Sequence, residues 1–176
     1  MYKFIYFTLL KWKIVGEFPK DLKKYIVIAA PHTHWFDFPM GLFLRKITHT
    51  TINFVGKKEL FIGPLGWYLR KVGGYAIDRT EGQNKVEAYA ELFKKNDQFI
   101  LNIAPEGTRK KVDKWKTGFY YIAKTANVPI VMVAFDFGKK QHKISKPFYP
   151  TEDKEADFKF MHSFYEGVVG KVPEYS

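Results

Sequence analysis

Three short runs of β-forming residues place the strongest constraint on how this chain can fold. The runs are Tyr25–Ala30, Phe99–Ala104 and Ile130–Phe135, and they are almost uninterrupted by polar residues. Strands that are apolar on both faces are typical of parallel sheets covered by helices on both sides. Between the runs, Lys85–Lys95 has apolar residues at i, i+3, i+4 and i+7, which predicts an amphipathic helix. The alternation predicts an α/β fold with a mainly parallel or mixed sheet flanked by helices.

The other periodic segments complete a single expected domain over residues 1–176. At this length the chain can bury a core of its own, and no repeat, linker or low-complexity tract divides it. Further helices are expected at Phe38–Arg45 and Pro64–Lys71, over Phe119–Ala126 and along a stripe from Phe158 to Val169, and short strands at Ile52–Val55, Tyr75–Ile77 and His142–Ser145.

Charge and cysteine content limit the classes of function that remain. Twenty-nine Lys and Arg residues against 18 Asp and Glu residues give a net charge of +11. This excess favours an anionic partner: nucleic acid, an anionic lipid surface or a phosphorylated small molecule. The absence of cysteine excludes disulfides, a thiol nucleophile and cysteine-ligated metal.

Two segments are candidates for contact with a membrane. As a helix, residues 1–13 would have a narrow polar stripe of Lys3, Thr8 and Lys11 on an otherwise apolar and aromatic surface. Such a helix suits the membrane interface, but it could equally dock on the core of the domain. The loop Lys110–Lys116 contains Trp115 and is either a contact for anionic lipid or an acyl carrier, or a solvated face with one half-buried aromatic. No apolar run reaches the roughly 20 residues needed to span a bilayer, so we expect a cytoplasmic protein that is peripherally associated with the membrane.

The loop after the first apolar strand contains the strongest catalytic candidates. It reads PHTHWFD over residues 31–37, and a helix is expected to follow with Asp37 as its N-cap. Loops that leave a strand and enter a helix are where open α/β sheets place their sites. His32 and Asp37 are close enough in sequence for the carboxylate to contact the imidazole. Such a contact fixes the imidazole tautomer and stabilises the imidazolium, so the pair could take the proton from an alcohol that attacks an acyl group.

Two further polar blocks follow predicted strands. The first, GGYAIDR, ends at Arg79, whose guanidinium could bind a phosphate or pair with a nearby carboxylate. The second, APEGTR, spans Ala104–Arg109. There the backbone around Gly107, with Thr108 and Arg109, could bind an anionic head group or form an ordinary polar turn.

The three blocks, with a fourth at Val128-Pro-Ile130, resemble in kind and order the motifs of the glycerolipid acyltransferases, in a short form similar to the lysophosphatidate acyltransferases. The resemblance implies a glycerol-3-phosphate acyltransferase-like fold and transfer of a fatty acyl group from acyl-CoA or acyl carrier protein to the hydroxyl of a lysophospholipid, with lysophosphatidate as the default acceptor. It implies His32 as general base oriented by Asp37, no cofactor or metal beyond the thioester co-substrate, and a membrane surface rather than nucleic acid as partner. The residues that it implies for binding the acceptor are Arg79, Glu106, Gly107, Thr108 and Arg109.

The sequence departs from the family pattern at one position of the catalytic loop, and it is also compatible with two other functions. His34 occupies a position where relatives often have a small polar residue, so the identity of the reacting imidazole needs a test. His32, His34 and Asp37 could instead bind zinc or manganese in a metallohydrolase, although the usual His-x-His-x-Asp spacing differs by one residue. A non-enzymatic module that binds RNA or a membrane would explain the charge but not three polar clusters at strand ends.

Overall fold

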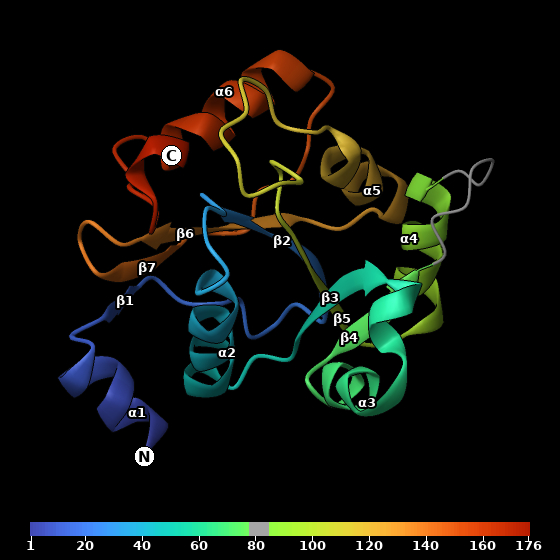
Figure 1. The fold of residues 1–176 in the computed structure, drawn as a ribbon. Coiled ribbons are helices and arrows are strands. Elements are labelled where there is room, and N and C mark those ends of the chain that lie inside the picture. The colour runs from blue at the N-terminus through green and yellow to red at the C-terminus, as the bar shows by residue number, and fades with distance from the viewer. Residues whose placement is uncertain (78–84) are drawn as a thin grey trace.

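A single sheet organises the computed structural model, which describes residues 1–77 and 85–176. Within these residues seven strands pair in the order β1-β7-β6-β2-β5-β3-β4 (Figure 1). Neighbouring strands are parallel except β6 and β7, which are antiparallel. The predicted α/β class is therefore confirmed. The strands are β1 (Lys13–Val15), β2 (Lys24–Ala30), β3 (Ile52–Lys57), β4 (Gly74–Ile77), β5 (Phe99–Ile103), β6 (Ile130–Asp136) and β7 (Gln141–Ile144).

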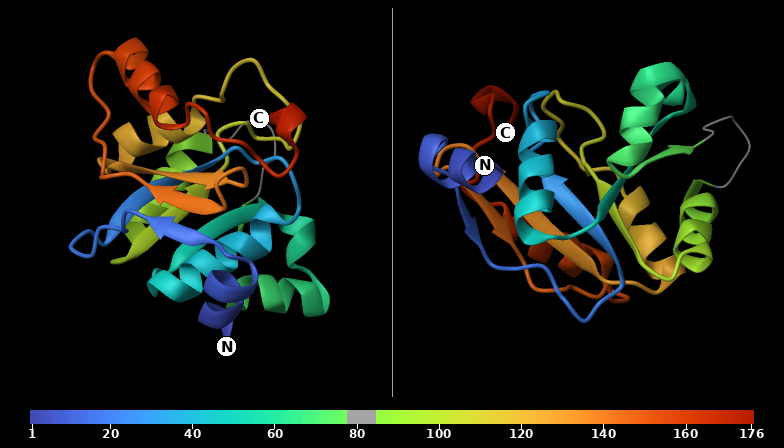
Figure 2. Two further views of the ribbon diagram at one scale, coloured as in Figure 1. Left: turned by 90° about the vertical axis from the view of Figure 1, so that its left-hand side faces the viewer. Right: turned by 90° about the horizontal axis from the view of Figure 1, so that it is seen from below.

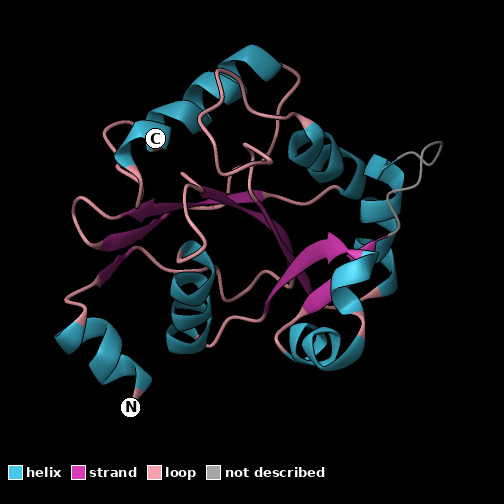
Figure 3. Ribbon diagram, viewed as in Figure 1, coloured by secondary structure: helices cyan, strands magenta, loops and turns pink. Residues whose placement is uncertain are grey.

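Helices cover both faces of the sheet (Figures 2 and 3). The N-terminal helices and α2 pack on one face, and α4, α5 and α6 pack on the other. The helices are α1 (Tyr2–Phe4), the π-helical turn η1 (Ile5–Leu9), α2 (Asp37–Thr48), the 3-10 turn η2 (Lys58–Phe61), α3 (Gly63–Lys71), α4 (Lys85–Lys95), α5 (Gly118–Ala126), α6 (Lys154–Phe164) and the 3-10 turn η3 (Pro173–Tyr175).

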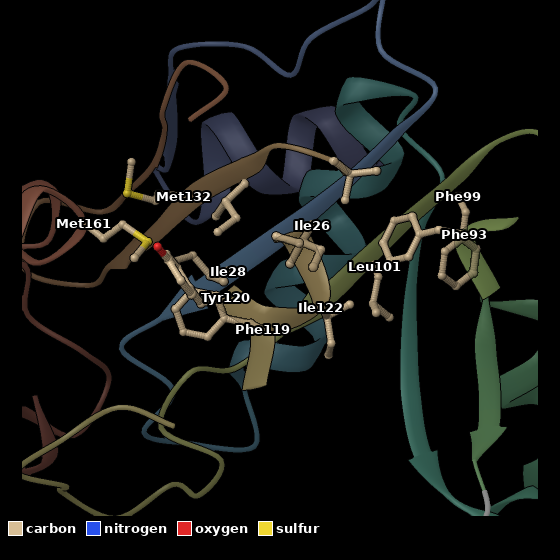
Figure 4. Close-up of a cluster of buried hydrophobic side chains, with 13 residues drawn as sticks. Ile26, Ile28, Phe93, Phe99, Leu101, Phe119, Tyr120, Ile122, Met132 and Met161 are labelled. Atoms are coloured by element: carbon tan, nitrogen blue, oxygen red, sulfur yellow. The ribbon is translucent and has the colours of Figure 1, made fainter. Parts of the chain in front are cut away.

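The position of β2 in the middle of the sheet explains why its sequence is continuously apolar. Ile26 and Ile28 point into the cluster formed with α4, α5 and α6 (Figure 4), whereas Tyr25 and Val27 point into the cluster on the α2 face. All four side chains are buried. A strand that is buried on both faces cannot alternate with polar residues, as the sequence indicated.

Two predicted helix ends are wrong. The last helix ends at Phe164 rather than near Val169, because Gly167 adopts φ +71, a left-handed conformation that breaks the helix. Asp37 is not the N-cap of α2: Phe36 occupies that position, and the Asp37 side chain accepts hydrogen bonds within the preceding loop instead.

The N-terminal helical segment is shorter than the predicted helix over residues 1–13, and its two faces differ in exposure to solvent. Helical structure ends at Leu9, and β1, which was not predicted, pairs with β7. Tyr6 and Trp12 are buried in the core, whereas Phe4 and Leu9 are 59% and 63% exposed. One face therefore docks on the protein and the other remains apolar and exposed. Among the described helices, none combines the length and the hydrophobicity that crossing a bilayer requires.

A buried tyrosine–histidine pair holds this segment on the sheet. A hydrogen bond of 2.6 Å joins Tyr6 Oη and His142 Nδ1, although the two residues are 136 positions apart. The His142 ring is fully buried among aromatic rings that include those of Trp12 and Phe135. Burial lowers the pKa of His142 from 6.5 to about 3.

We expect this histidine to make the fold sensitive to acid. Between pH about 6.5 and about 3 the unfolded chain binds a proton at His142 that the folded chain does not. The free energy of unfolding therefore falls as the pH decreases through this window. The variant His142→Phe should lose several kcal/mol of this dependence, on the order expected from such a shift, as measured by denaturant unfolding at a series of pH values. Tyr6→Phe, which leaves the histidine buried, should keep the dependence. Parallel pH curves for the wild type and His142→Phe would contradict the assignment.

Candidate active site

The parallel pairing of β2 with β5 brings two of the predicted polar loops together. The strands are in register from Lys24 opposite Phe99 to Ile28 opposite Ile103, so the loops that follow them leave the same edge of the sheet (Figure 1). As a result, Arg109 Nε lies 3.4 Å from His32 Nε2, although 77 positions separate the residues.

His32 and Asp37 form the contact that their spacing suggested. His32 Nδ1 lies 3.0 Å from Asp37 Oδ2, and the backbone N–H groups of Thr33 and His34 donate to the same oxygen, each at 2.9 Å. Asp37 is 4% exposed, whereas the His32 side chain is 28% exposed. Because a carboxylate can only accept, Nδ1 carries the proton, and the lone pair of Nε2 is on the far side of the ring from Asp37, where it faces Arg109 Nε.

His34, the second histidine of the loop, makes different contacts from those of His32. Its Nδ1 accepts the backbone N–H of Phe36 at 3.1 Å, and its ring lies against Trp35. The contact with the carboxylate therefore belongs to His32. Within the described part of the chain, no three His, Asp or Glu side chains converge as metal ligands.

Glu106 connects the loop after β5 to the loop after β2. Its Oε1 accepts the backbone N–H of His32 at 3.1 Å, and the side chain is buried. Burial raises the pKa of the Glu106 carboxyl, and the hydrogen bonds from the backbone of Glu106 and His32 oppose that shift. The carboxylate is thus in position to hold the segment that carries the imidazole.

Gly107 lets a lysine approach the same loop. Its φ is +65, and an added Cβ would lie 2.7 Å from Lys116 Nζ. Only glycine allows both the left-handed backbone and this close approach. Lys116, which the sequence indicated only as part of a basic surface loop, is therefore next to the predicted anion-binding turn.

Two hollows meet at His32. One is an apolar cavity of about 240 Å³ between α2 and the sheet, and the other is a wider cleft of about 820 Å³ lined by Thr108, Lys110 and Lys116 among others. His32, Arg109 and Asn102 line both. The imidazole lies between an apolar space and a cationic one, so it can accept a proton from a hydroxyl that enters from the cationic side.

The remaining predicted residues divide into three cases. Thr108 is exposed at the cleft and its Oγ1 accepts the N–H of Lys110 at 3.3 Å. Arg79 lies outside the described residues. Trp115 packs against His162 and Tyr165 of the protein, so the aromatic side chain of the basic loop is half-buried on its own domain. Asn102 was not predicted, because an isolated polar residue in an apolar strand has no recognisable motif.

The sequence of the chain is similar to those of known proteins. A family model described as Acyltransferase matches residues 12–136. The chain is 33% identical over 138 residues to the 1-acyl-sn-glycerol-3-phosphate acyltransferase of Streptococcus pneumoniae, an alignment that covers 73% of this chain and 50% of the relative. It is 33% identical over 130 residues to the protein of the same name from Saccharomyces cerevisiae, with 69% and 41% covered. The chain thus spans about half the length of these curated relatives.

A solved structure is also similar. The 1-acyl-sn-glycerophosphate (LPA) acyltransferase PlsC from Thermotoga maritima matches with a TM-score of 0.62 and 27% sequence identity. The match covers 90% of this chain and 71% of that chain.

Proposed function

This chain belongs to the acyltransferase family, and we propose that it transfers a fatty acyl group from a thioester to the hydroxyl of lysophosphatidate in phospholipid biosynthesis. The thioester would be acyl-CoA or acyl carrier protein. The observation that carries the proposal is the position of His32 Nε2, which is opposite the nitrogen bound to Asp37 and lies where the apolar cavity meets the cationic cleft. The relatives named 1-acyl-sn-glycerol-3-phosphate acyltransferases support the same reaction.

In the proposed mechanism His32 moves a single proton. Nε2 accepts the proton of the acceptor hydroxyl as that oxygen attacks the thioester carbonyl. The carbon–sulfur bond then breaks, and the imidazolium returns the proton to the departing thiolate. Asp37 stabilises the imidazolium between the two steps. A positioned base of this kind contributes roughly 10²–10⁴ in rate, and holding both substrates together contributes further.

The two hollows suit the two substrates. The cavity beneath α2, lined by residues such as Phe18, Val27 and Leu44, suits an acyl chain, and the cationic cleft suits a phosphate. Arg109 Nε faces His32 Nε2 in the structure. A phosphate that attracts the guanidinium would therefore free Nε2 for the hydroxyl. For Arg79 the proposed role in phosphate binding is supported by the motif alone.

We also propose that the enzyme works at a membrane surface. The exposed apolar face of the N-terminal segment, with Phe4 and Leu9, and the net charge of +11 support contact with anionic lipid. Trp115 is occupied by packing within the protein, so the basic loop would contribute charge rather than an aromatic anchor.

A panel of donors and acceptors tests the reaction directly. Labelled acyl-CoA and acyl carrier protein are each offered with lysophosphatidate, with lysophospholipids that have larger head groups, and with no acceptor. Mass spectrometry of the lipids should show phosphatidate, with release of free thiol that depends on the acceptor. Thiol release at the same rate without acceptor would indicate a thioesterase, and no release would contradict the proposal.

Replacing Arg109 by Ala should weaken binding of the acceptor phosphate. We expect the KM for lysophosphatidate to rise about tenfold to a hundredfold, the range for a lost hydrogen bond to a charged group. Monoacylglycerol, which has no phosphate, is the matched control: the variant and the wild type should use it equally poorly. Equal losses on both acceptors would show that Arg109 acts on the chemistry and not on the phosphate.

A further inference from the structure

The Asn102 side chain lies where the two hollows meet. Four of the described residues line both the apolar cavity and the cationic cleft: His32, Asn102, Ala104 and Arg109. His32 and Arg109 have roles in the proposed reaction, and the methyl group of Ala104 forms no hydrogen bond. Among the described residues, Asn102 is therefore the one polar side chain at this junction that the proposed mechanism does not use.

The alternation of side chains along β5 directs Asn102 toward the apolar cavity. Successive side chains of a strand point to opposite faces of the sheet. Ile100 packs in the cluster beneath α2, whereas Leu101 points into the cluster with α4, α5 and α6 (Figure 4). Asn102 is therefore on the same face as Ile100. Its register partner in β2 is Val27, which lines the same cavity.

The pairing of β3 with β5 ends at Asn102. β3 pairs with β5 only from Ile52 to Phe54, which is opposite Asn102, but it continues to pair with β4 as far as Lys57. Val55, the next residue of β3, lines the cleft. The spaces on the two faces of the sheet therefore approach each other beyond Asn102, and this explains why a residue of the cavity wall also borders the cleft.

The amide of Asn102 is half-buried, and over the two described ranges of the chain it has no hydrogen-bond partner. An amide that faces an apolar space without a partner costs free energy. The amide gains a partner when a substrate places a hydrogen-bond acceptor at the junction. In the proposed reaction this acceptor is the carbonyl oxygen of the thioester, because the acyl chain extends from the carbonyl carbon into the cavity while the attacking hydroxyl enters from the cleft.

We propose that Asn102 is a catalytic residue whose side-chain amide donates a hydrogen bond to the thioester carbonyl oxygen as that oxygen becomes an oxyanion. The inference rests on the proposed function, since it assumes that an acyl chain occupies the cavity beneath α2. When the acceptor oxygen bonds to the carbonyl carbon, an electron pair of the C=O double bond moves to the carbonyl oxygen. The amide N–H stabilises this charge until the double bond forms again and the carbon–sulfur bond breaks. The thiolate then takes the proton from His32. A donor that is already in position interacts most strongly in the transition state.

Asn102→Leu and Asn102→Asp test the proposal, because neither new side chain donates a hydrogen bond at neutral pH. Leucine has a similar volume, and aspartate retains the shape of asparagine in case the leucine variant folds poorly. Each variant should lower kcat by roughly 10²–10³, the range for loss of one oxyanion donor. The KM values for both substrates should change little, since the interaction is made in the transition state.

A thioether analogue of the donor, in which a methylene replaces the carbonyl group, is the matched control. It fills the acyl cavity but offers no oxygen to Asn102, so its inhibition constant should be the same for the wild type and both variants. Thermal unfolding gives a second readout. Because the amide has no partner within the described chain, Asn102→Leu should melt at the wild-type temperature or above it.

Three results would overturn the inference alone. The first is an unchanged kcat in both variants. The second is a loss confined to the KM for lysophosphatidate, since the amide would then bind the acceptor and not the reacting carbonyl. The third is a lower melting temperature with a matching rise in the inhibition constant of the thioether, which would show a structural role in the cavity wall. Absence of transfer by the wild type with every donor and acceptor would overturn the proposed function and this inference with it.

Discussion

Replacing His32 by Ala should abolish acyl transfer while the melting temperature stays close to that of the wild type. Among the described residues, the imidazole is the only side chain in contact with Asp37 that also lines both hollows. Its loss removes the proton acceptor and should lower kcat by at least the roughly 10²–10⁴ typical of a general base. Little packing is lost, because the side chain is partly exposed and Asp37 keeps the N–H groups of Thr33 and His34 as partners. Single-turnover assays and thermal unfolding measure the two effects separately.

His34→Ala is the matched control for this prediction. Both histidines lie in the same loop, but within residues 1–77 and 85–176 the His34 ring accepts the N–H of Phe36 and has no hydrogen bond to the carboxylate. We expect its activity to remain within a few-fold of the wild type. If His34→Ala were the more severe of the two changes, the base would be assigned to the wrong imidazole.

The sequence predicted the parts of this fold that depend on local pattern. Runs such as Tyr25–Ala30 are apolar because both faces of the strand are buried. Because β2 and β5 are adjacent and parallel, the loops that follow them lie at the same edge of the sheet. The contact between His32 and Asp37 was predictable for the same reason, since both residues lie in one short loop. The contact of Arg109 with His32 follows from the pairing of β2 with β5, which the sequence did not predict, although the resemblance to the family assigned both residues to the site.

Other features depend on contacts between distant residues, and no local pattern indicates them. The division of the N-terminal segment into a docked and an exposed face depends on the contact of Tyr6 with His142, which lies 136 positions away in β7. The hydrogen bond from Arg45 to the carbonyl of Val72 is a second example, since a residue of any type at position 72 would supply that carbonyl. The early end of α6 is different, because Gly167 is visible in the sequence. Val168 and Val169 beyond it continue the apolar stripe but lie outside the helix.

Replacing Asp37 by Asn separates the charge of the carboxylate from its geometry. Oδ2 accepts three hydrogen bonds, from His32 Nδ1 and the N–H groups of Thr33 and His34. An amide oxygen at this position can accept all three, so the loop and the imidazole tautomer are retained. The negative charge that stabilises the imidazolium is lost, and we expect kcat to fall on the order of a hundredfold. The amide nitrogen would occupy the site of Oδ1, which is buried without a hydrogen-bond partner among the described residues, so the melting temperature should fall slightly.

Asp37→Ala, and a double variant that combines Asp37→Asn with His32→Ala, test the role of the carboxylate further. Alanine removes the acceptor from two backbone N–H groups as well as from the imidazole, so it should cost about 1–3 kcal/mol of stability for each donor that stays buried and unpaired. It should also reduce kcat more than the asparagine does. Because the carboxylate acts only through the imidazole, Asp37→Asn should have no further effect on kcat once His32 is Ala. Independent, multiplying losses in the double variant would mean that Asp37 contributes to turnover by a route that does not pass through His32.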